Sequence, residues 1–467
     1  MQGPIYLTAD IRRIEEAAGN ASPPLMERAG AAAAALAAKL LPETSKDILV
    51  LAGPGNNGGD ALIAAELLAQ RFFRVTIAKR PEDLPEGKHW GLIIDGLFGI
   101  GLARPIEGDY RKLVEYANAQ RCPVLALDVP SGIQSDSGRV LGAAVRATHT
   151  MTFIALKPGL LTLDGPDHCG EIVVADLNLD VKALLPPPAW VAGPEHFRAV
   201  LKPRPRNFHK GMAGSLGVLG GAPGMAGAAL LAGRAALKLG AGRVYVGFLQ
   251  KNTIEVDHVS PELMLRHADE VLGVDLDAIV AGPGLGTTEH GATLVGAALA
   301  SDMPCVLDAD ALNLLAEDED LADACERRTA DTLLTPHPAE AARLLGTTVA
   351  EVQANRIAAA QRIASTFNAH VVLKGNGSVL AARDGHWFIN ASGNPGMASA
   401  GTGDVLAGIL GALLAQRYTG ETALVLGVHL HGAAADTLVR SGTGPVGLTA
   451  GELIEPARRL WNEWLAK

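Results

Sequence analysis

The chain has 467 residues, which is too long for one ordinary domain and favours two or three. Hydrophobic residues make up 48% and charged residues 19%, so a large buried core is available and disorder is not expected. The net charge of −10 and the aromatic content of 4% argue against nucleic acid or an anionic membrane as the main partner, because those partners favour basic surfaces and stacking platforms. The 54 glycines indicate many tight turns and ligand-binding loops, so we expect a soluble α/β enzyme.

The cysteines and the hydropathy pattern indicate the cellular compartment in which the protein is expected. Four cysteines lie far apart without any CxxC pair, namely Cys122, Cys169, Cys305 and Cys325. A disulfide framework or a structural zinc site is therefore not expected, and a reducing cytoplasm fits. The first residues lack the pattern of a signal peptide, and no run reaches 18 uncharged apolar residues, so no membrane span is predicted.

The first half alternates strand patterns with helix patterns. An alanine-rich helix is expected over 30–41, and an apolar strand over 47–53 precedes a helix over 60–71. Further strands are predicted at 74–79, 91–99, 122–130 and 149–156. Continuous apolar strands separated by helices predict a parallel sheet covered on both faces. We therefore expect a Rossmann-like, doubly wound α/β domain.

A proline-rich segment over 184–210 then interrupts this alternation. It predicts a boundary between domains 1–195 and 196–467, with the basic run 202–210 as a solvated connector and an anion contact as the alternative. Beyond it, strand and helix patterns resume, with long helices over 225–240 and 404–417. The predicted strands are 215–221, 243–248, 278–284, 305–310, 331–337 and 370–375. Two unlike α/β domains are expected.

Three segments of the first half end strands with residues suited to ligands. GPGNNGGD (53–60) lies between a strand and a helix, where glycines allow close backbone approach and the helix N-terminus favours an anion. A tight turn with Asp60 as helix cap is the alternative. DGLFGIGLARP (95–105) and LDVPSG (127–132) each place an aspartate at the carboxyl end of a strand, the edge where open α/β sheets bind ligands. Together, the three segments favour a ligand-binding site at this edge of the sheet.

These segments, with LMERAG (25–30) and FIALKPG (153–159), follow the order seen in the NAD(P)H-hydrate epimerase domain, which the first 195 residues resemble. The resemblance implies epimerisation at C6 of hydrated NADH or NADPH. It places potassium at Asn57, Asp95 and Ser131, and Asp128 in contact with the reacting nucleotide. Because opening and reclosing the C6 carbinolamine moves a proton, Asp128 is the acid–base candidate. Lys157 is a weaker candidate, whose alternative is a phosphate contact or a surface charge. The residues implied to bind the hydrate are Asn56, Asn57, Gly58, Gly59, Asp60, Gly99, Ile100, Gly101, Leu102, Ala103, Arg104, Pro105 and Asp128.

The second half contains NPGMASAGTGDVLAGIL (394–410), in which small residues precede an apolar helix. Backbone N–H groups at such a helix start can form an anion hole for a transferred phosphoryl group. Asp404 in the first turn could accept the proton of an attacking hydroxyl, and a simple helix cap is the alternative. The Walker A pattern is absent, which excludes a P-loop kinase.

This GTGD motif resembles the ribokinase-like superfamily. The segments 210–237, 282–286, 307–313, 335–340 and 374–378 resemble the NAD(P)H-hydrate dehydratase pattern, with Ala400 where a glycine is common. The resemblance implies ADP-dependent dehydration of the S hydrate, with Asp404 as base and Ala226, Gly286, His337 and Asp404 at the hydrate. The residues implied to bind ADP are Lys374, Gly375, Asn376, Gly377, Ser378, Asn394, Gly396, Ala398, Ser399, Gly401, Thr402 and Gly403.

Mg²⁺ is expected with the nucleotide. Asp308 and Asp310 could lie near a metal, although capping at the end of a strand is the favoured interpretation. Without the motif, His337 is better explained as an ordinary loop histidine.

The combined interpretation is a bifunctional enzyme that repairs both epimers of hydrated NAD(P)H. We expect it to be cytoplasmic and homo-oligomeric, with small-molecule substrates and no nucleic-acid or membrane partner. A ribokinase-like small-molecule kinase with a nucleotide-binding appendage is the enzyme alternative, and a stable phosphorylated product would identify it. A binding or scaffold protein is the alternative from another class, which the presence of Asn57, Asp95, Asp128 and Asp404 disfavours.

Overall fold

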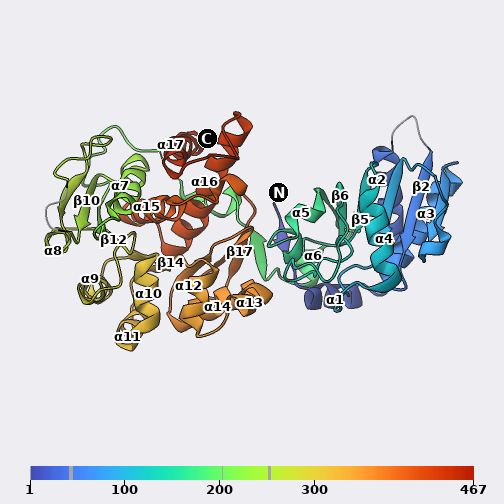
Figure 1. The fold of residues 1–467 in the computed structure, drawn as a ribbon, viewed down its shortest axis with the longest axis horizontal. Coiled ribbons are helices and arrows are strands. Elements are labelled where there is room, and N and C mark those ends of the chain that lie inside the picture. Colours follow the sequence, from blue (N-terminus) through green and yellow to red (C-terminus); the bar gives the residue numbers. More distant parts are fainter. Residues whose placement is uncertain (1, 42–45, 202, 251–253, 467) are drawn as a thin grey trace. The chain divides into compact units, whose positions relative to one another are not determined.

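The computed structural model describes residues 2–41, 46–201, 203–250 and 254–466 (Figure 1). The chain divides into two compact units, residues 1–190 and 191–467. Each unit is built around its own parallel or largely parallel sheet with helices packed on it. The α/β class predicted for both halves is confirmed.

The first unit contains a six-stranded sheet in the order β3-β2-β4-β5-β6-β7. Every neighbouring pair in this sheet is parallel. Its strands are β2 (Asp47–Ala52), β3 (Arg74–Ala78), β4 (Leu92–Gly96), β5 (Val124–Leu127), β6 (His149–Phe153) and β7 (Glu171–Ala175). The sequence pattern predicted all of these strands except β7, in which no residue is fully buried.

Successive side chains along the strands of the first unit point to opposite faces of the sheet and fill two separate cores. Ile48 and Val50 point to the face covered by α1 (Thr8–Ala17), α2 (Leu25–Leu40) and α3 (Asn56–Gln70). Leu49 and Leu51 point to the opposite face, which α4 (Gly108–Ala119) covers. The doubly wound architecture follows from strands that are apolar on both faces. The short elements of this unit are β1 (Pro4–Ile5), α5 (Pro166–Cys169) and α6 (Val181–Leu184). β1 pairs antiparallel with β8 (Ala189–Val191), a strand that contains the boundary between the units.

The sheet of the second unit runs in the order β17-β16-β15-β14-β13-β12-β9-β10-β11. The strands from β15 to β11 are parallel, whereas β16 and β17 form an antiparallel hairpin beside β15. The strands are β9 (Ser215–Gly220), β10 (Arg243–Phe248), β11 (Met264–His267), β12 (Ala278–Ala281), β13 (Cys305–Leu307), β14 (Thr332–Leu334), β15 (His370–Leu373), β16 (Ser378–Ala381) and β17 (Trp387–Asn390). The sequence pattern did not predict β11 or this hairpin, although Asp384–Gly385 is a common hairpin-turn pair.

Helix α15 (Thr402–Ala415) lies at the centre of the second unit and packs on α7 (Ala226–Lys238). The two helices approach so closely that a Cβ at Gly408 would lie 2.1 Å from the carbonyl oxygen of Ala232. The other helices are α8 (Ala268–Val271), α9 (Glu289–Ala300), α10 (Asp310–Glu317), α11 (Glu319–Glu326), α12 (Pro338–Leu345), α13 (Val349–Ala354), α14 (Arg356–Thr366), α16 (Gly420–Arg440) and α17 (Ile454–Leu465).

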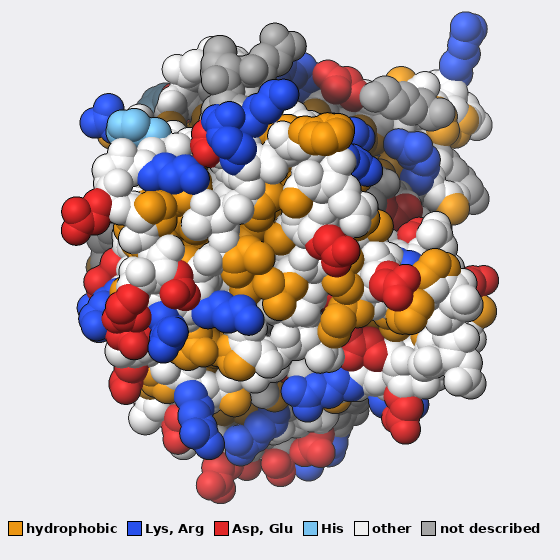
Figure 2. Space-filling view, turned by 90° about the vertical axis from the view of Figure 1, so that its right-hand side faces the viewer, with side chains coloured by type: hydrophobic (Ala, Val, Ile, Leu, Met, Phe, Trp, Pro, Cys, Tyr) orange, Lys and Arg blue, Asp and Glu red, His pale blue; other side chains and the backbone are white. Residues whose placement is uncertain are grey.

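Helix α16 is long and apolar enough to cross a membrane by length and composition alone. However, 61% of its most apolar window is buried inside the structure, and the helix packs against α15 and α17. This environment is typical of a core helix. On the face shown in Figure 2, basic and acidic side chains are interspersed around hydrophobic ones.

The boundary between the units falls after Trp190, a few residues before the boundary predicted from the sequence. Phe197 lies in the second unit, is 1% exposed, and its ring packs against His429 and Trp464 of that unit. Ala192 donates its backbone N–H to the carbonyl of Ile389 at 2.9 Å. Residues 191–201 are therefore part of the second unit rather than a free linker.

We predict that a fragment of residues 191–467 unfolds cooperatively in urea, and that a fragment starting at Pro203 is less stable. The shorter fragment loses the buried Phe197, and removing a buried phenylalanine costs about 3–5 kcal/mol. The variant Phe197→Ala in the longer fragment should reproduce most of this loss. Equal unfolding midpoints for the two fragments would contradict the boundary.

Candidate active sites

A cavity of about 300 Å³ opens at the carboxyl ends of β2, β4 and β5 in the first unit. This is the edge where parallel α/β sheets bind ligands. The cavity brings together the three segments that the sequence singled out. It is lined by Ile11, Arg12, Glu15, Pro54, Gly55, Asn56, Asn57, Asp60, Leu97, Phe98, Gly99, Ile100, Gly101, Leu102, Asp128, Phe153, Ile154 and Lys157.

Asn57 lies in the first turn of α3 and is only 8% exposed. Neither the oxygen nor the nitrogen of its amide has a hydrogen-bond partner among the described residues. A buried amide without partners in the protein is costly, so its oxygen and nitrogen are available to a ligand. A Cβ at Gly99 would lie 3.3 Å from the Asn57 amide carbon and 2.8 Å from Asp128 Oδ2, so these groups converge on the cavity.

Asp95 and Ser131 form a buried pair beside the cavity. Ser131 donates its hydroxyl to Asp95 Oδ1 at 2.6 Å and its backbone N–H to Oδ2 at 2.8 Å. Burial raises the pKa of Asp95 to about 6, although these hydrogen bonds oppose the shift. A cation beside this carboxylate would favour its ionised form. The residues present therefore fit a monovalent cation held by Asn57, Asp95 and Ser131.

Asp128 and Lys157 form an ion pair in the wall of the cavity. The Lys157 side chain is fully buried, and Nζ donates to Asp128 Oδ1 at 2.6 Å, to the Thr152 hydroxyl at 2.9 Å and to the Phe153 carbonyl at 2.6 Å. All three N–H donors of the ammonium are thus used, and the alternative that Lys157 is a surface charge is wrong, whereas the phosphate contact stays a prediction. Asp128 Oδ2 accepts the backbone N–H of Ile100 at 3.1 Å.

Asp60 and Glu15 add two further carboxyl groups to the cavity. Burial and the nearby Asp128 raise the pKa of Asp60 to about 7, and the same causes raise the pKa of Glu15. Helix α3 begins at Asn56 with Gly55 as its N-cap, so the alternative of Asp60 as helix cap is wrong. The sequence did not point to Glu15, because its helix α1 is distant along the chain from every glycine-rich segment that was singled out.

Not all predicted residues of the first unit line the cavity. Ala103, Arg104 and Pro105 are exposed in the loop that follows β4. Gly58 and Gly59 lie inside α3, where a Cβ at Gly58 would lie 2.0 Å from the Gly53 carbonyl oxygen. Gly58 therefore serves the tight turn between β2 and α3.

In the second unit, Asp404 lies in the first turn of α15, whose N-cap is Gly401 with φ of 90°. The alternative that Asp404 is merely the N-cap is therefore wrong. Burial and the nearby carboxylate of Asp308 raise the pKa of Asp404 to about 6, and Lys374 opposes this shift. The group is ionised at neutral pH but binds a proton more readily than an ordinary aspartate.

Lys374 follows β15 and donates from Nζ to Asp308 Oδ1 at 2.9 Å. Asp308 is 1% exposed and also accepts the Thr335 hydroxyl at 2.5 Å. A Cβ at Gly403 would lie 3.3 Å from Lys374 Nζ, so this ion pair lies directly beside the start of α15. The side chain of Asp308 thus bonds to other side chains, so the interpretation that it caps the end of the strand is wrong. Asp310 does bind a backbone group, because it accepts the N–H of Gly286 at 2.8 Å.

The two glycine-rich loops of the second unit are held by their own side chains. Asn394 donates to Asp436 Oδ1 at 3.0 Å and accepts the Gly396 N–H at 3.0 Å. The Thr402 hydroxyl donates to the carbonyl of Ser399 at 3.0 Å. Ala398 is exposed, and Ser378 donates its hydroxyl to the Gly375 carbonyl at 3.0 Å. The loops therefore have defined shapes.

The residues predicted to contact the hydrate come from neighbouring turns. Ala226 begins α7, and a Cβ at Gly284 would lie 2.6 Å from the carbonyl oxygen of the preceding Met225. His337 is the N-cap of α12, where Nδ1 accepts the N–H groups of Ala339 and Glu340. Burial and the nearby Lys374 lower the pKa of His337, so the ring is neutral at pH 7.

Comparison with known families divides the chain in the same way. Residues 216–457 match the family described as NAD(P)H-hydrate dehydratase. Residues 22–91 and 78–159 match the family described as YjeF-related protein N-terminus. The boundary between the compact units lies between these two matched regions.

Similar proteins cover almost the whole chain. The bifunctional NAD(P)H-hydrate repair enzyme Nnr of Escherichia coli is 38% identical, over 98% of this chain and 94% of that protein. The enzyme of the same name from Coxiella burnetii is 37% identical, over 98% of this chain and 99% of that protein. A crystal structure of the ADP/ATP-dependent NAD(P)H-hydrate dehydratase of Bacillus subtilis, co-crystallised with ATP/Mg²⁺, is 32% identical with a TM-score of 0.51, and it covers 59% of this chain and 98% of its own.

These similarities confirm the family and the ribokinase-like fold expected from the motifs. The two compact units agree in order with the two matched families. The chain belongs to the family of bifunctional NAD(P)H-hydrate repair enzymes.

Proposed function

We propose that residues 1–190 epimerise hydrated NAD(P)H at C6 and that residues 191–467 dehydrate the S epimer with ADP as phosphoryl donor. The observation that carries the proposal is the pair of separate sites in one chain. One is the cavity with Asn57, Asp128 and Lys157, and the other is Asp404 beside Lys374 at the start of a buried helix. A dehydratase acting on one epimer would leave the other unrepaired, so the fusion has a chemical reason.

In the dehydratase, Asp404 accepts the proton of the C6 hydroxyl as its oxygen attacks the terminal phosphorus of ADP. The bond to AMP breaks, and the phosphoryl group is now on C6. Phosphate then leaves with the C6–O bonding electrons, and loss of a proton from C5 restores the double bond. Backbone N–H groups at the start of α15 and the ammonium of Lys374 stabilise the transferred charge.

The loops 374–378 and 394–403 supply the nucleotide site in this proposal. Their support is their defined shape and their position around Lys374 and the start of α15. Among the described residues, no group of three or more His, Cys, Asp or Glu side chains is placed to hold a metal ion. Mg²⁺, which neutralises phosphate charge, would therefore enter with the nucleotide and retain most of its water.

In the epimerase, inversion at C6 requires the carbinolamine to open and reclose, which moves a proton on and off the C6 oxygen. Asp128 is held for this task by Lys157 and the Ile100 N–H at the cavity wall. Potassium held by Asn57, Asp95 and Ser131 would supply positive charge for the phosphates of the hydrate. A homo-oligomeric assembly and a cytoplasmic location stay predictions.

We predict that Asp404→Asn lowers the dehydration rate by about 10²–10⁴-fold, because general-base assistance is lost. Helix α15 should remain intact, since Gly401 is its N-cap. Interconversion of the R and S epimers should continue at the original rate. Chromatography of the epimers together with absorbance of regenerated NADH checks both activities.

The matched control is Glu289→Gln, which removes an acidic side chain from the first turn of α9. This variant should retain both activities. Dehydration by Asp404→Asn at close to the wild-type rate would show that the carboxylate is not the base. Accumulation of a stable phosphorylated product by the wild-type enzyme would favour a small-molecule kinase instead.

We predict that the dehydration rate falls as the pH drops through about 6, where Asp404 binds a proton. The sign follows from the raised pKa, because the base works only when ionised and an ordinary aspartate would lose activity at lower pH. His431 should not contribute, since burial lowers its pKa to about 4. A pH profile of kcat at saturating substrates checks this, and an acid limb near pH 4 would contradict it.

We predict that epimerisation requires a monovalent cation of the size of potassium. Replacing K⁺ with tetramethylammonium should slow interconversion of the epimers, and KCl should raise the melting temperature of the fragment 1–190. Asn57→Ala should abolish both responses, because it removes a buried ligand without other partners. The control Asn118→Ala removes an amide in α4 that bonds to the Ala144 carbonyl, and it should keep both. Full activity without K⁺ would contradict the site.

A further inference from the structure

Arg356 opens α14 and lies behind the loop that follows β15. Its side chain is buried, with only 2% of the residue exposed. Nη2 donates to the carbonyls of Leu373, Lys374 and Gly377 at 3.2, 3.4 and 3.5 Å. One guanidinium therefore fixes both ends of the loop 373–377.

The loop is shaped to lie against this guanidinium. Gly375 has φ of 145°, and a Cβ there would lie 2.8 Å from Arg356 Nη1 and 2.9 Å from Nη2. Any side chain at this position would collide with the guanidinium. Gly375 and Asn376 are exposed to solvent on the other side. A ligand on this loop would be separated from the positive charge by little more than the thickness of the backbone.

The positive charge of Arg356 has no carboxylate partner among the residues that the structure describes. Nη1 donates to the neutral amide of Gln353 at 2.9 Å, and Nε has no partner. Burial is the cause that lowers the pKa of this group to about 10. Lys374, in the same loop, instead has Asp308 as its counter-ion. A buried charge without a counter-ion is costly, which indicates that an anion supplies the compensation.

We infer that Arg356 is a positioning residue of the nucleotide site, which holds the loop 373–377 in shape and whose charge is neutralised by the anionic nucleotide bound there. This inference rests on the proposed function of the second unit. It adds a residue that lies outside the glycine-rich motifs and touches the nucleotide only through the loop.

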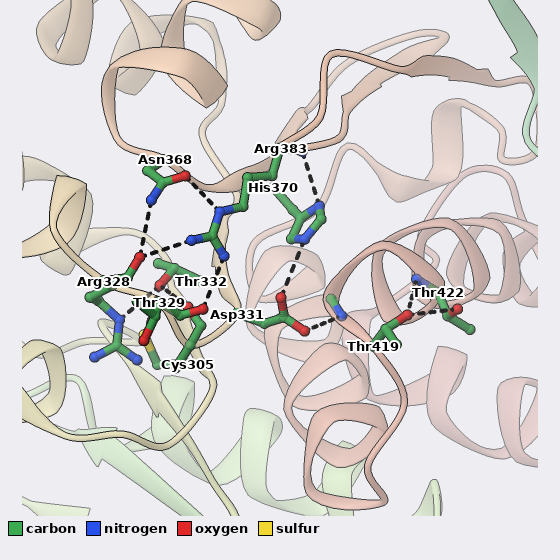
Figure 3. Close-up of polar contacts among 12 residues, drawn as sticks. Cys305, Arg328, Thr329, Asp331, Thr332, Asn368, His370, Arg383, Thr419 and Thr422 are labelled. Carbon is green, nitrogen blue, oxygen red and sulfur yellow. Dashed lines mark hydrogen bonds and ion pairs between the residues drawn. The ribbon is translucent and has the colours of Figure 1, made fainter.

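The chain offers a matched control in Arg328, a second buried arginine that holds backbone carbonyls. It is 5% exposed and donates to the carbonyls of Ala298, Leu299, Ser301 and Met303. Its Nε donates to the Thr332 hydroxyl at 2.9 Å, and its own carbonyl accepts from Asn368 and Arg383 (Figure 3). These contacts serve the segments 298–303 and 328–332 rather than the nucleotide loop.

The test compares Arg356→Met, Arg356→Lys and Arg328→Lys in the full chain. Titration calorimetry with ADP gives the affinity, and dehydration of the S hydrate gives KM for ADP and kcat. Arg356→Met should raise both Kd and KM for ADP roughly 10- to 100-fold, the equivalent of one hydrogen bond to a charged group. The kcat at saturating ADP should change much less. Arg356→Lys, which keeps the charge but loses the planar fork, should recover part of the affinity.

Arg328→Lys should lower the unfolding midpoint while its Kd for ADP stays at the wild-type value. Each variant should keep the cooperative unfolding transition in urea that is expected of residues 191–467, which shows that the second unit is folded. A wild-type Kd for ADP in Arg356→Met, with wild-type enzyme that binds ADP, would overturn this inference and leave the proposed function intact. Failure of the wild-type enzyme to bind either ADP or ATP would overturn the proposed function and this inference with it.

Discussion

Parallel pairing of strands is the constraint on which both sites depend. In a parallel sheet all strands run the same way, so the loops that follow them emerge at one edge. In the first unit this edge gathers Asn57, Asp95 and Asp128 from segments that follow or end three different strands. In the second it gathers Asp308, His337 and Lys374 after β13, β14 and β15. Residues separated by tens of positions in sequence are thereby brought to one edge of a sheet.

Each site contains a lysine whose charge is met by an aspartate at the end of a strand. Lys157 is bound to Asp128 and Lys374 to Asp308, each within hydrogen-bond distance. Such pairs place positive charge at each candidate site without an unpaired charge in the apolar interior. Each lysine is paired with only one carboxylate, so the other carboxyl groups of the site have a different electrostatic environment. Asp60 and Asp404 have no such lysine as hydrogen-bond partner among the described residues, and burial raises their pKa values to about 7 and about 6.

Close backbone packing fixes these groups relative to the sheets. Gly58 allows α3 to start directly above the turn after β2, and Gly408 allows α15 to touch α7. In both cases an added Cβ would lie about 2 Å from a carbonyl oxygen, so the abundance of glycine reflects packing as well as ligand binding. This explains why some glycines of the motifs line no cavity.

The sequence by itself determined the α/β class, most of the strands and the segments that form the sites. It could do so because apolar strand runs and glycine-rich turns are local patterns. Only the tertiary structure revealed that Lys157 is fully buried, that α3 already begins at Asn56 so that Asp60 is not its cap, and that Glu15 reaches the cavity from α1. Likewise, Phe197 belongs to the second core, and Arg356 supports the loop after β15 from outside any motif. Burial and counter-ions depend on contacts between distant segments, which no local pattern encodes.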